Sequence, residues 1–193
     1  MAIPKEYERY TWRDYQSWPD DERWELFNGM AWAMSPAPNR SHQKLAGELF
    51  RQFANFLLGA ECQVFVAPFD VKLSEEASDE DDPTVFQPDL VLCCDPSKLK
   101  DWGMQGAPDL VVEILSPKSG VRDRKVKFDL YERYRVGEYW ILDPDGQVLE
   151  IYRHNGSRYE RVGAFSGEDT VPVSMLPGFT VEMALLFPKP QNT

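Results

Sequence analysis

APDLVVEIL, residues Ala107 to Leu115, is the stretch that decides the fold. After Pro-Asp it is almost continuously apolar, which is typical of a strand covered on both faces. A second stretch, QPDLVLCC from Gln87 to Cys94, repeats Pro-Asp followed by apolar residues. The two stretches therefore predict neighbouring central strands of one sheet.

Working outward, the sequence before these strands predicts a hairpin and a helix. Residues 23–34, RWELFNGMAWAM, contain two short strand-like runs around Asn28-Gly29, a dipeptide that tolerates the positive φ of a tight turn. Apolar residues at helical spacing then continue until Gly59. Either Asn39 or Ser41 is suited to cap the start of that helix.

A second helix is expected after the central strands, from about residue 122 to residue 134. Turn dipeptides at Asp145-Gly146 and Asn155-Gly156 then predict a C-terminal β-meander. This order indicates an α/β or α+β fold, in which helices flank a mixed central sheet. With 193 residues, we expect a single domain over 1–193 with its core at about 23–153.

Composition excludes several classes of protein. A hydrophobic content of 42% with six tryptophans is too high for a disordered or collagen-like chain. Because no apolar run is long enough for a signal peptide or a membrane span, we expect a cytoplasmic protein. The three cysteines, Cys62, Cys93 and Cys94, are an odd number and two of them are adjacent in a strand, so we predict that they are reduced and buried.

Charge is unevenly distributed. The net charge of −11 argues against a protein that coats nucleic acid non-specifically. Between Ser116 and Arg135, however, seven basic residues face three acidic ones, which predicts a local positive face. The candidates for contacting nucleic acid within it are Lys118, Arg122, Arg124 and Lys125.

Glu113 lies inside the predicted central strand and is the most informative residue. A buried carboxylate needs a compensating cation, either a metal ion or a lysine. If the two strands are neighbours, Asp89 and Glu113 present carboxylates at one end of the sheet, and such ligands suit Mg²⁺ or Mn²⁺. In the alternative interpretation, Asp89 and Asp109 merely start their strands and Glu113 pairs with a structural cation.

Lys127 is the candidate lysine. If the second helix packs over the same sheet, Lys127 and Tyr131 lie one turn apart beside its apolar stripe, and the ammonium could reach Glu113. The alternative is a surface ion pair between Lys127 and Asp123, which would contribute little to stability.

Four stretches together resemble the Uma-type family of restriction endonucleases. They are QPD at 87–89, APDLVVEILSP at 107–117, RDRKVKFDLY at 122–131 and GEYWILDP at 137–144. The resemblance implies the PD-(D/E)xK nuclease superfamily and its restriction endonuclease-like fold. It also implies that Asp89 and Glu113 are the metal-binding acids, with the main-chain carbonyl of Ile114 as a further ligand.

The chain departs from the superfamily pattern at the lysine. Leu115 stands where the strand lysine is usual, and the resemblance assigns its role to Lys127 on the following helix, with Lys125 as the competitor. Glu25 matches an acid that serves as a third metal ligand or orients the water; the alternative is an exposed strand carboxylate. His42 matches a histidine near the phosphate or the metal, and the alternative is a partly buried capping residue.

The resemblance implies a Mg²⁺- or Mn²⁺-dependent endonuclease that hydrolyses DNA phosphodiester bonds. The alternative is a catalytically inactive nuclease-fold module that binds nucleic acid or a protein partner. The resemblance to short nucleases of this fold also favours a homodimer, with YERYTWRDYQSW at 7–18 as a candidate interface. No motif for a nucleotide cofactor or for nucleophilic catalysis is present in the sequence.

Overall fold

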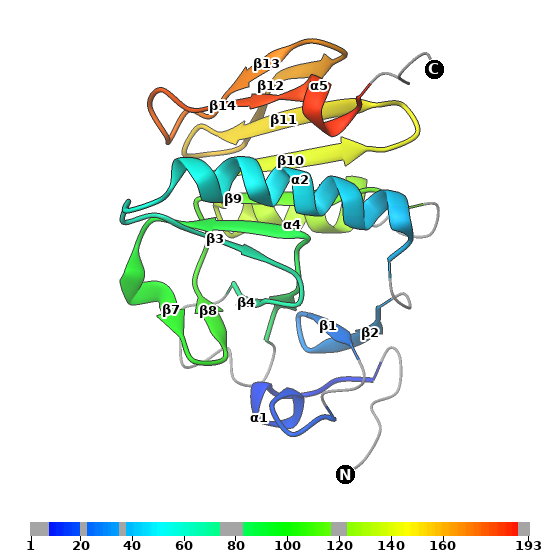
Figure 1. The fold of residues 1–193 in the computed structure, drawn as a ribbon. Coiled ribbons are helices and arrows are strands. Elements are labelled where there is room, and N and C mark those ends of the chain that lie inside the picture. Colours follow the sequence, from blue (N-terminus) through cyan, green and yellow to red (C-terminus); the bar gives the residue numbers. More distant parts are fainter. Residues whose placement is uncertain (1–7, 20–22, 35–37, 74–82, 117–122, 189–193) are drawn as a thin grey trace.

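The computed structural model describes residues 8–19, 23–34, 38–73, 83–116 and 123–188. These residues form two mixed sheets, a two-stranded ribbon and a few helices (Figure 1). Within the described ranges, no helix combines the length and apolarity needed to cross a bilayer.

The main sheet carries the two predicted central strands. Its spatial order is β12-β11-β10-β9-β6-β3. The bounds are β3 Gln63–Val66, β6 Leu90–Cys93, β9 Leu110–Ile114, β10 Glu138–Asp143, β11 Val148–His154 and β12 Tyr159–Ser166. β9 runs antiparallel to β6 and parallel to β10. The prediction that the two apolar stretches are neighbours is therefore confirmed.

The N-terminal sheet contains the predicted hairpin. Its order is β2-β1-β5-β4-β8-β7. The bounds are β1 Trp24–Phe27, β2 Met30–Ala33, β4 Asp70–Lys72, β5 Val85–Phe86, β7 Leu99–Lys100 and β8 Gly103–Gln105. At the hairpin turn Asn28 and Gly29 have φ values of 47° and 78°, the positive φ that this dipeptide tolerates.

Helices occupy both predicted positions, 40–56 and 123–133, and the structure adds three short helical segments that the sequence did not predict, at 12–15, 96–98 and 183–186. In chain order, the helical segments are α1 Trp12–Tyr15, α2 Arg40–Phe56, the 3₁₀ turn η2 Pro96–Lys98, the π-helical segment η3 Asp123–Lys127, α4 Phe128–Arg133 and α5 Met183–Leu186. Asn39, not Ser41, caps α2, because its side chain accepts the His42 N–H at 2.9 Å. The segment η3 runs directly into α4, so Lys127 is the last residue before the α-helix.

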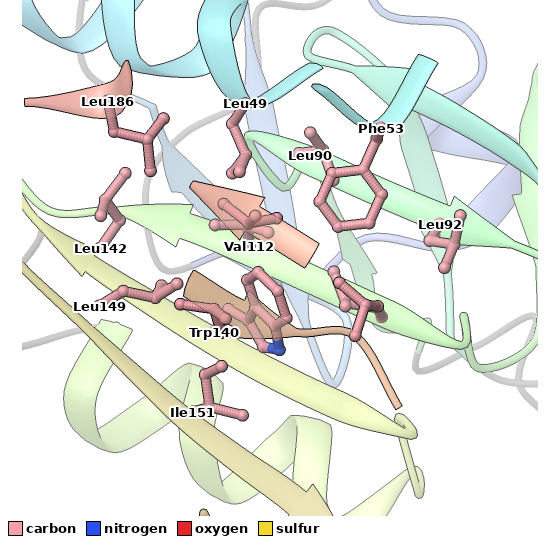
Figure 2. Packing of buried hydrophobic residues seen from close by; sticks show 14 of the residues in the cluster. Leu49, Phe53, Leu90, Leu92, Val112, Trp140, Leu142, Leu149, Ile151 and Leu186 are labelled. Atoms are coloured by element: carbon pink, nitrogen blue, oxygen red, sulfur yellow. The ribbon is translucent and has the colours of Figure 1, made fainter. Parts of the chain in front are cut away.

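Opposite faces of the main sheet pack against different elements. On one face, Leu49 and Phe53 of α2 pack over Leu90, Val112 and Trp140 (Figure 2). On the other face, alternate residues of the same strands pack against α4 and the N-terminal sheet. Because side chains alternate along a strand, Glu113 belongs with Val111 to the second face.

The C-terminal part of the chain packs on the same face of the main sheet as α2. The meander β10-β11-β12 is confirmed, and β13 Thr170–Pro172 pairs with β14 Thr180–Glu182 as a separate ribbon. The stretch FTVEMALLF is not one strand, because β14 ends at Glu182 and α5 follows at once. Apolar residues of this region join the same core cluster as α2.

The prediction of three reduced cysteines is wrong for two of them. Cys62 and Cys94 form a disulfide with an S–S distance of 2.07 Å, whereas Cys93 is free and buried. The reason lies in the strand register: Gln63 pairs with Cys93, so the next step places Cys62 opposite Cys94. The adjacency of two cysteines in the sequence does not reveal this cross-strand partner.

Candidate active site

Three buried charged residues meet between the two sheets. The Lys127 Nζ lies 2.7 Å from Glu113 Oε1 and 2.9 Å from Glu25 Oε1. Glu25 is 0% exposed, Lys127 2% and Glu113 4%. The lysine thus bridges two carboxylates in an environment where unpaired charges would be costly.

Different elements bring these residues together. Glu113 projects from β9, in the middle of the main sheet, while Glu25 projects from β1 of the N-terminal sheet. Lys127 comes from the end of η3, which packs on the second face of the main sheet as predicted. The Gln87 N–H, 3.4 Å from Glu25 Oε1, adds a contact from the chain between β5 and β6.

Tyr131 completes the cluster. Its hydroxyl donates to Glu113 Oε1 at 2.8 Å, and the residue is fully buried. Burial, reinforced by the negative charge of Glu113, raises the pKa of Tyr131 well above its ordinary value, so the phenol keeps its proton and remains a donor. Tyr131 was expected one turn from Lys127 but without a role of its own; the one-turn spacing was the available signal.

Asp89 lies at the start of β6, on the side of Glu113. Its Oδ2 accepts the Ile114 N–H at 2.8 Å and lies 3.2 Å from His42 Nε2. Leu90 pairs with Val112, so one further step in this antiparallel register places Asp89 opposite Glu113. The N–H and C=O of a residue in an extended strand point the same way, so the Ile114 carbonyl also faces the Asp89 side.

These residues suit a magnesium site of the kind that relies on water and phosphate for its remaining ligands. In the described part of the chain, no three His, Cys, Asp or Glu side chains form a group that could hold a metal ion by themselves. Mg²⁺, however, is commonly bound through one or two carboxylates together with waters and substrate phosphates. Asp89, Glu113 and the Ile114 carbonyl fit that requirement, and Glu25 is connected to them through Lys127.

The predicted site residues thus separate into buried and exposed groups. For Glu25, the alternative of an exposed strand carboxylate is wrong, because the residue is fully buried. Of the two competing lysines, Lys127 lies in the cluster, whereas Lys125 is exposed. His42 contacts Asp89 from the first turn of α2.

A cavity of about 540 Å³ is lined by His42, the residue that contacts Asp89, and not by the buried residues Glu25, Glu113, Lys127 and Tyr131. Its lining comes from the start of α2, the end of β9, η3 and the turn after β10: Asn39, Ser41, His42, Leu115, Ser116, Arg124, Lys125, Asp143, Pro144 and Asp145. Arg124 also pairs with Glu150 and lies 3.9 Å from Asp143. Two of the four predicted nucleic-acid contacts, Arg124 and Lys125, therefore line the cavity; Lys118 and Arg122 lie outside the described residues.

A second polar network, which the sequence did not reveal, is centred on Asp70 and reaches Glu25 through Gln87. Asp70 Oδ1 accepts hydrogen bonds from the Tyr15 hydroxyl at 2.8 Å and from Gln87 Nε2 at 2.9 Å. Burial raises the pKa of Asp70 and, more strongly, that of Tyr15. Since the backbone of Gln87 reaches Glu25, this network is continuous with the candidate site.

Comparisons with known proteins identify the family and the fold. A family model named Uma2, described as "Putative restriction endonuclease", matches residues 12–184. The "Uncharacterized protein slr1290" of Synechocystis sp. is 27% identical over 153 residues, which are 79% of this chain and 74% of that protein. The crystal structure of a "putative nuclease belonging to DUF820" from Anabaena variabilis matches with a TM-score of 0.71 and 19% identity, over 92% of this chain and 97% of that one. The predicted mixed α+β fold is therefore confirmed.

Proposed function

Since the chain belongs to the Uma2 family, we propose that it is a magnesium-dependent endonuclease that hydrolyses phosphodiester bonds in DNA. The family description and the nuclease named in the structural comparison support a nuclease in general terms. The metal, the DNA substrate and the site residues are the further content of this proposal.

One observation carries the proposal: a buried lysine joins two glutamates, and an aspartate at the start of the neighbouring strand β6 lies beside them. Lys127 contacts Glu113 and Glu25, and Asp89 contacts the residue that follows Glu113. A purely structural ion pair needs one carboxylate for one lysine. The additional acids give this cluster a net negative charge, which favours binding a further cation.

The residues divide the chemistry between them. Asp89 and Glu113 would hold Mg²⁺ together with the Ile114 carbonyl, and Glu25 would assist. When bound, Mg²⁺ polarises the phosphoryl oxygens and lowers the pKa of water at the site. Lys127 supplies positive charge beside the glutamates, and His42, 3.2 Å from Asp89, faces the cavity, where it can contact a phosphate or a water molecule.

The basic side chains of the cavity are suited to the DNA backbone. Lys125 is exposed and lines the cavity with Arg124 and His42, so both basic residues can meet phosphates that enter the cavity. Such contacts fix the position of the backbone without reading the base sequence. Lys118 and Arg122 remain predictions for the same role.

Metal binding tests the proposal whatever the target sequence in DNA is. We would titrate Mn²⁺ and Mg²⁺ into the wild type and into Asp89→Asn/Glu113→Gln by calorimetry, and then assay nicking of supercoiled DNA. The matched control is Asp109→Asn/Glu138→Gln, which removes a strand-start aspartate and a buried glutamate outside the cluster. Loss of metal binding and of nicking in the site variant alone would support the proposal. A site variant that binds the metal and nicks DNA as well as the control does would reject it.

The alternative, a non-catalytic module that binds nucleic acid or a protein, is favoured by one observation. Lys127 is 2% exposed and already neutralises much of the glutamate charge. Salt dependence separates the two kinds of module: a nucleic-acid binder loses affinity steeply as salt increases, whereas a module for protein partners shows no affinity for DNA at any salt concentration.

The homodimer also remains a proposal, to be tested by light scattering on the purified chain. Within the predicted interface at 7–18, Trp12 is buried, and Tyr10, Tyr15 and Trp18 pack against its cluster. These aromatic residues therefore cover the N-terminal sheet, in addition to any contact they make with a second copy.

A further inference from the structure

Two donors from one helical segment hold the same oxygen of Glu113. Lys127 Nζ lies 2.7 Å from Glu113 Oε1, and the Tyr131 hydroxyl donates to that oxygen at 2.8 Å. The two residues are four positions apart and reach the carboxylate from successive turns. The terminal torsion of a glutamate is otherwise broad, so a double contact to one oxygen fixes the plane of the carboxylate.

The two donors are not equivalent. Lys127 is shared with Glu25 at 2.9 Å, so its ammonium alone does not set the orientation of Glu113. The Tyr131 ring is held by Phe86 and Tyr139, with ring centroids 5.2 and 4.9 Å away. Its hydroxyl is therefore a rigid donor on an otherwise flexible carboxylate.

We propose that Tyr131 is a positioning residue that orients Glu113 for metal binding. With Oε1 held by two donors, the carboxylate of Glu113 keeps one orientation relative to Asp89, which lies opposite it in the strand register. The inference rests on the proposed function, because it assigns Tyr131 a part in the metal site described above. It differs from a purely structural role, in which the hydroxyl would merely satisfy a buried carboxylate.

The test compares two tyrosines that each lose one buried hydroxyl. Tyr131→Phe removes the donor to Glu113 and keeps the ring. Tyr159→Phe is the matched control, because the Tyr159 hydroxyl is also buried and donates to the Val136 carbonyl at 3.0 Å. The dissociation constant for Mn²⁺ is measured by calorimetry without DNA, and kcat and KM are measured for nicking. Urea unfolding and the Mn²⁺-induced rise in melting temperature are recorded for each protein.

Loss of an outer partner of a metal ligand typically weakens metal affinity or activity about 10- to 100-fold. We expect a loss of this size in Mn²⁺ affinity for Tyr131→Phe, with a lower kcat and an unchanged KM. Tyr159→Phe should bind Mn²⁺ as the wild type does, although both variants lose stability.

Three results would overturn the inference, and they differ from one another. Equal Mn²⁺ affinity and kcat in Tyr131→Phe and Tyr159→Phe would reject the positioning role while the proposed function stands. Failure of Tyr131→Phe to fold would assign the hydroxyl to structure. Absence of both Mn²⁺ binding and nicking in the wild type would reject the proposed function itself, and the inference with it.

Discussion

Asp89 and Asp109 occupy equivalent positions at opposite ends of the β6–β9 pair. Asp89 Oδ2 accepts the Ile114 N–H at 2.8 Å, and Asp109 Oδ2 accepts the Cys94 N–H at 2.7 Å. In an antiparallel pair these are the same contact seen from either strand. Both aspartates therefore serve the strand-start role that the alternative interpretation gave them. What distinguishes Asp89 is its position beside Glu113 and His42.

This equivalence makes Asp109 an internal control for Asp89. Asparagine keeps an acceptor for the backbone N–H, so Asp89→Asn and Asp109→Asn should each change the free energy of unfolding by only about 1 kcal/mol. Only Asp89→Asn should abolish Mn²⁺ binding, because only Asp89 lies opposite a second proposed metal ligand, the carboxylate of Glu113. Calorimetry and urea unfolding of both variants measure the two effects. Loss of binding in Asp109→Asn as well would contradict the assignment.

The buried network at Asp70 predicts an unusual pH dependence. Burial raises the pKa of Asp70 in the folded protein, so its contribution to stability is complete below the ordinary aspartate value of about 3.9 and is lost as pH rises through the higher folded value. At neutral pH the ionised carboxylate therefore costs stability. We expect Asp70→Asn to be more stable than the wild type at pH 7, with the difference shrinking toward pH 4, as measured by urea unfolding.

Asp14 serves as the comparison, because its pKa is shifted in the opposite direction from that of Asp70. Hydrogen bonds from the side chain and backbone of Thr11 hold the pKa of Asp14 below its ordinary value. Its contribution is therefore present above the unfolded value and lost as pH falls through the folded one. Asp14→Asn should lower stability at pH 7, and the gap should close in acid. Parallel pH profiles for Asp14→Asn and Asp70→Asn would disprove the electrostatic assignment of both.

The Cys62–Cys94 disulfide predicts one free thiol in the native chain. The two cysteines are 32 positions apart, and closing a loop of this size stabilises a protein by about 3 to 4 kcal/mol through the unfolded state. We expect alkylation in denaturant without reductant to label Cys93 alone, and Cys62→Ser/Cys94→Ser to lose stability of that order. Labelling of all three cysteines would show that the bond does not form in the purified protein.

Local chemistry accounts for the parts of the fold that were predictable. Asn28-Gly29 specified its turn through the positive φ it tolerates, and the apolar runs after Asp89 and Asp109 specified buried strands. Glu113 was recognisable because a charge within such a run needs a cation.

Features that depend on register or on distant segments were not predictable in the same way. Cys62 meets Cys94 only through the pairing of β3 with β6. The burial of Glu25 depends on how the N-terminal sheet packs against the main sheet, and the contacts of Asp70 bring together Tyr15 and Gln87, which lie far from it in the sequence. Tyr131 lies between these cases: its helical spacing from Lys127 was visible, but its hydrogen bond to Glu113 required the packing of α4 on the sheet.

The charge balance of the cluster predicts how Lys127 substitutions behave. Lys127→Met keeps most of the volume but leaves Glu25 and Glu113 buried without their shared cation, which should cost about 3 to 5 kcal/mol of unfolding free energy. Adding Glu25→Gln and Glu113→Gln to the same protein should restore most of that loss, because the uncompensated charges disappear. Lys125→Met, at an exposed position on the same segment, is the control and should change stability little. If Lys127→Met alone is as stable as this control, the lysine does not compensate the glutamates, and the electrostatic basis assigned to the site is wrong.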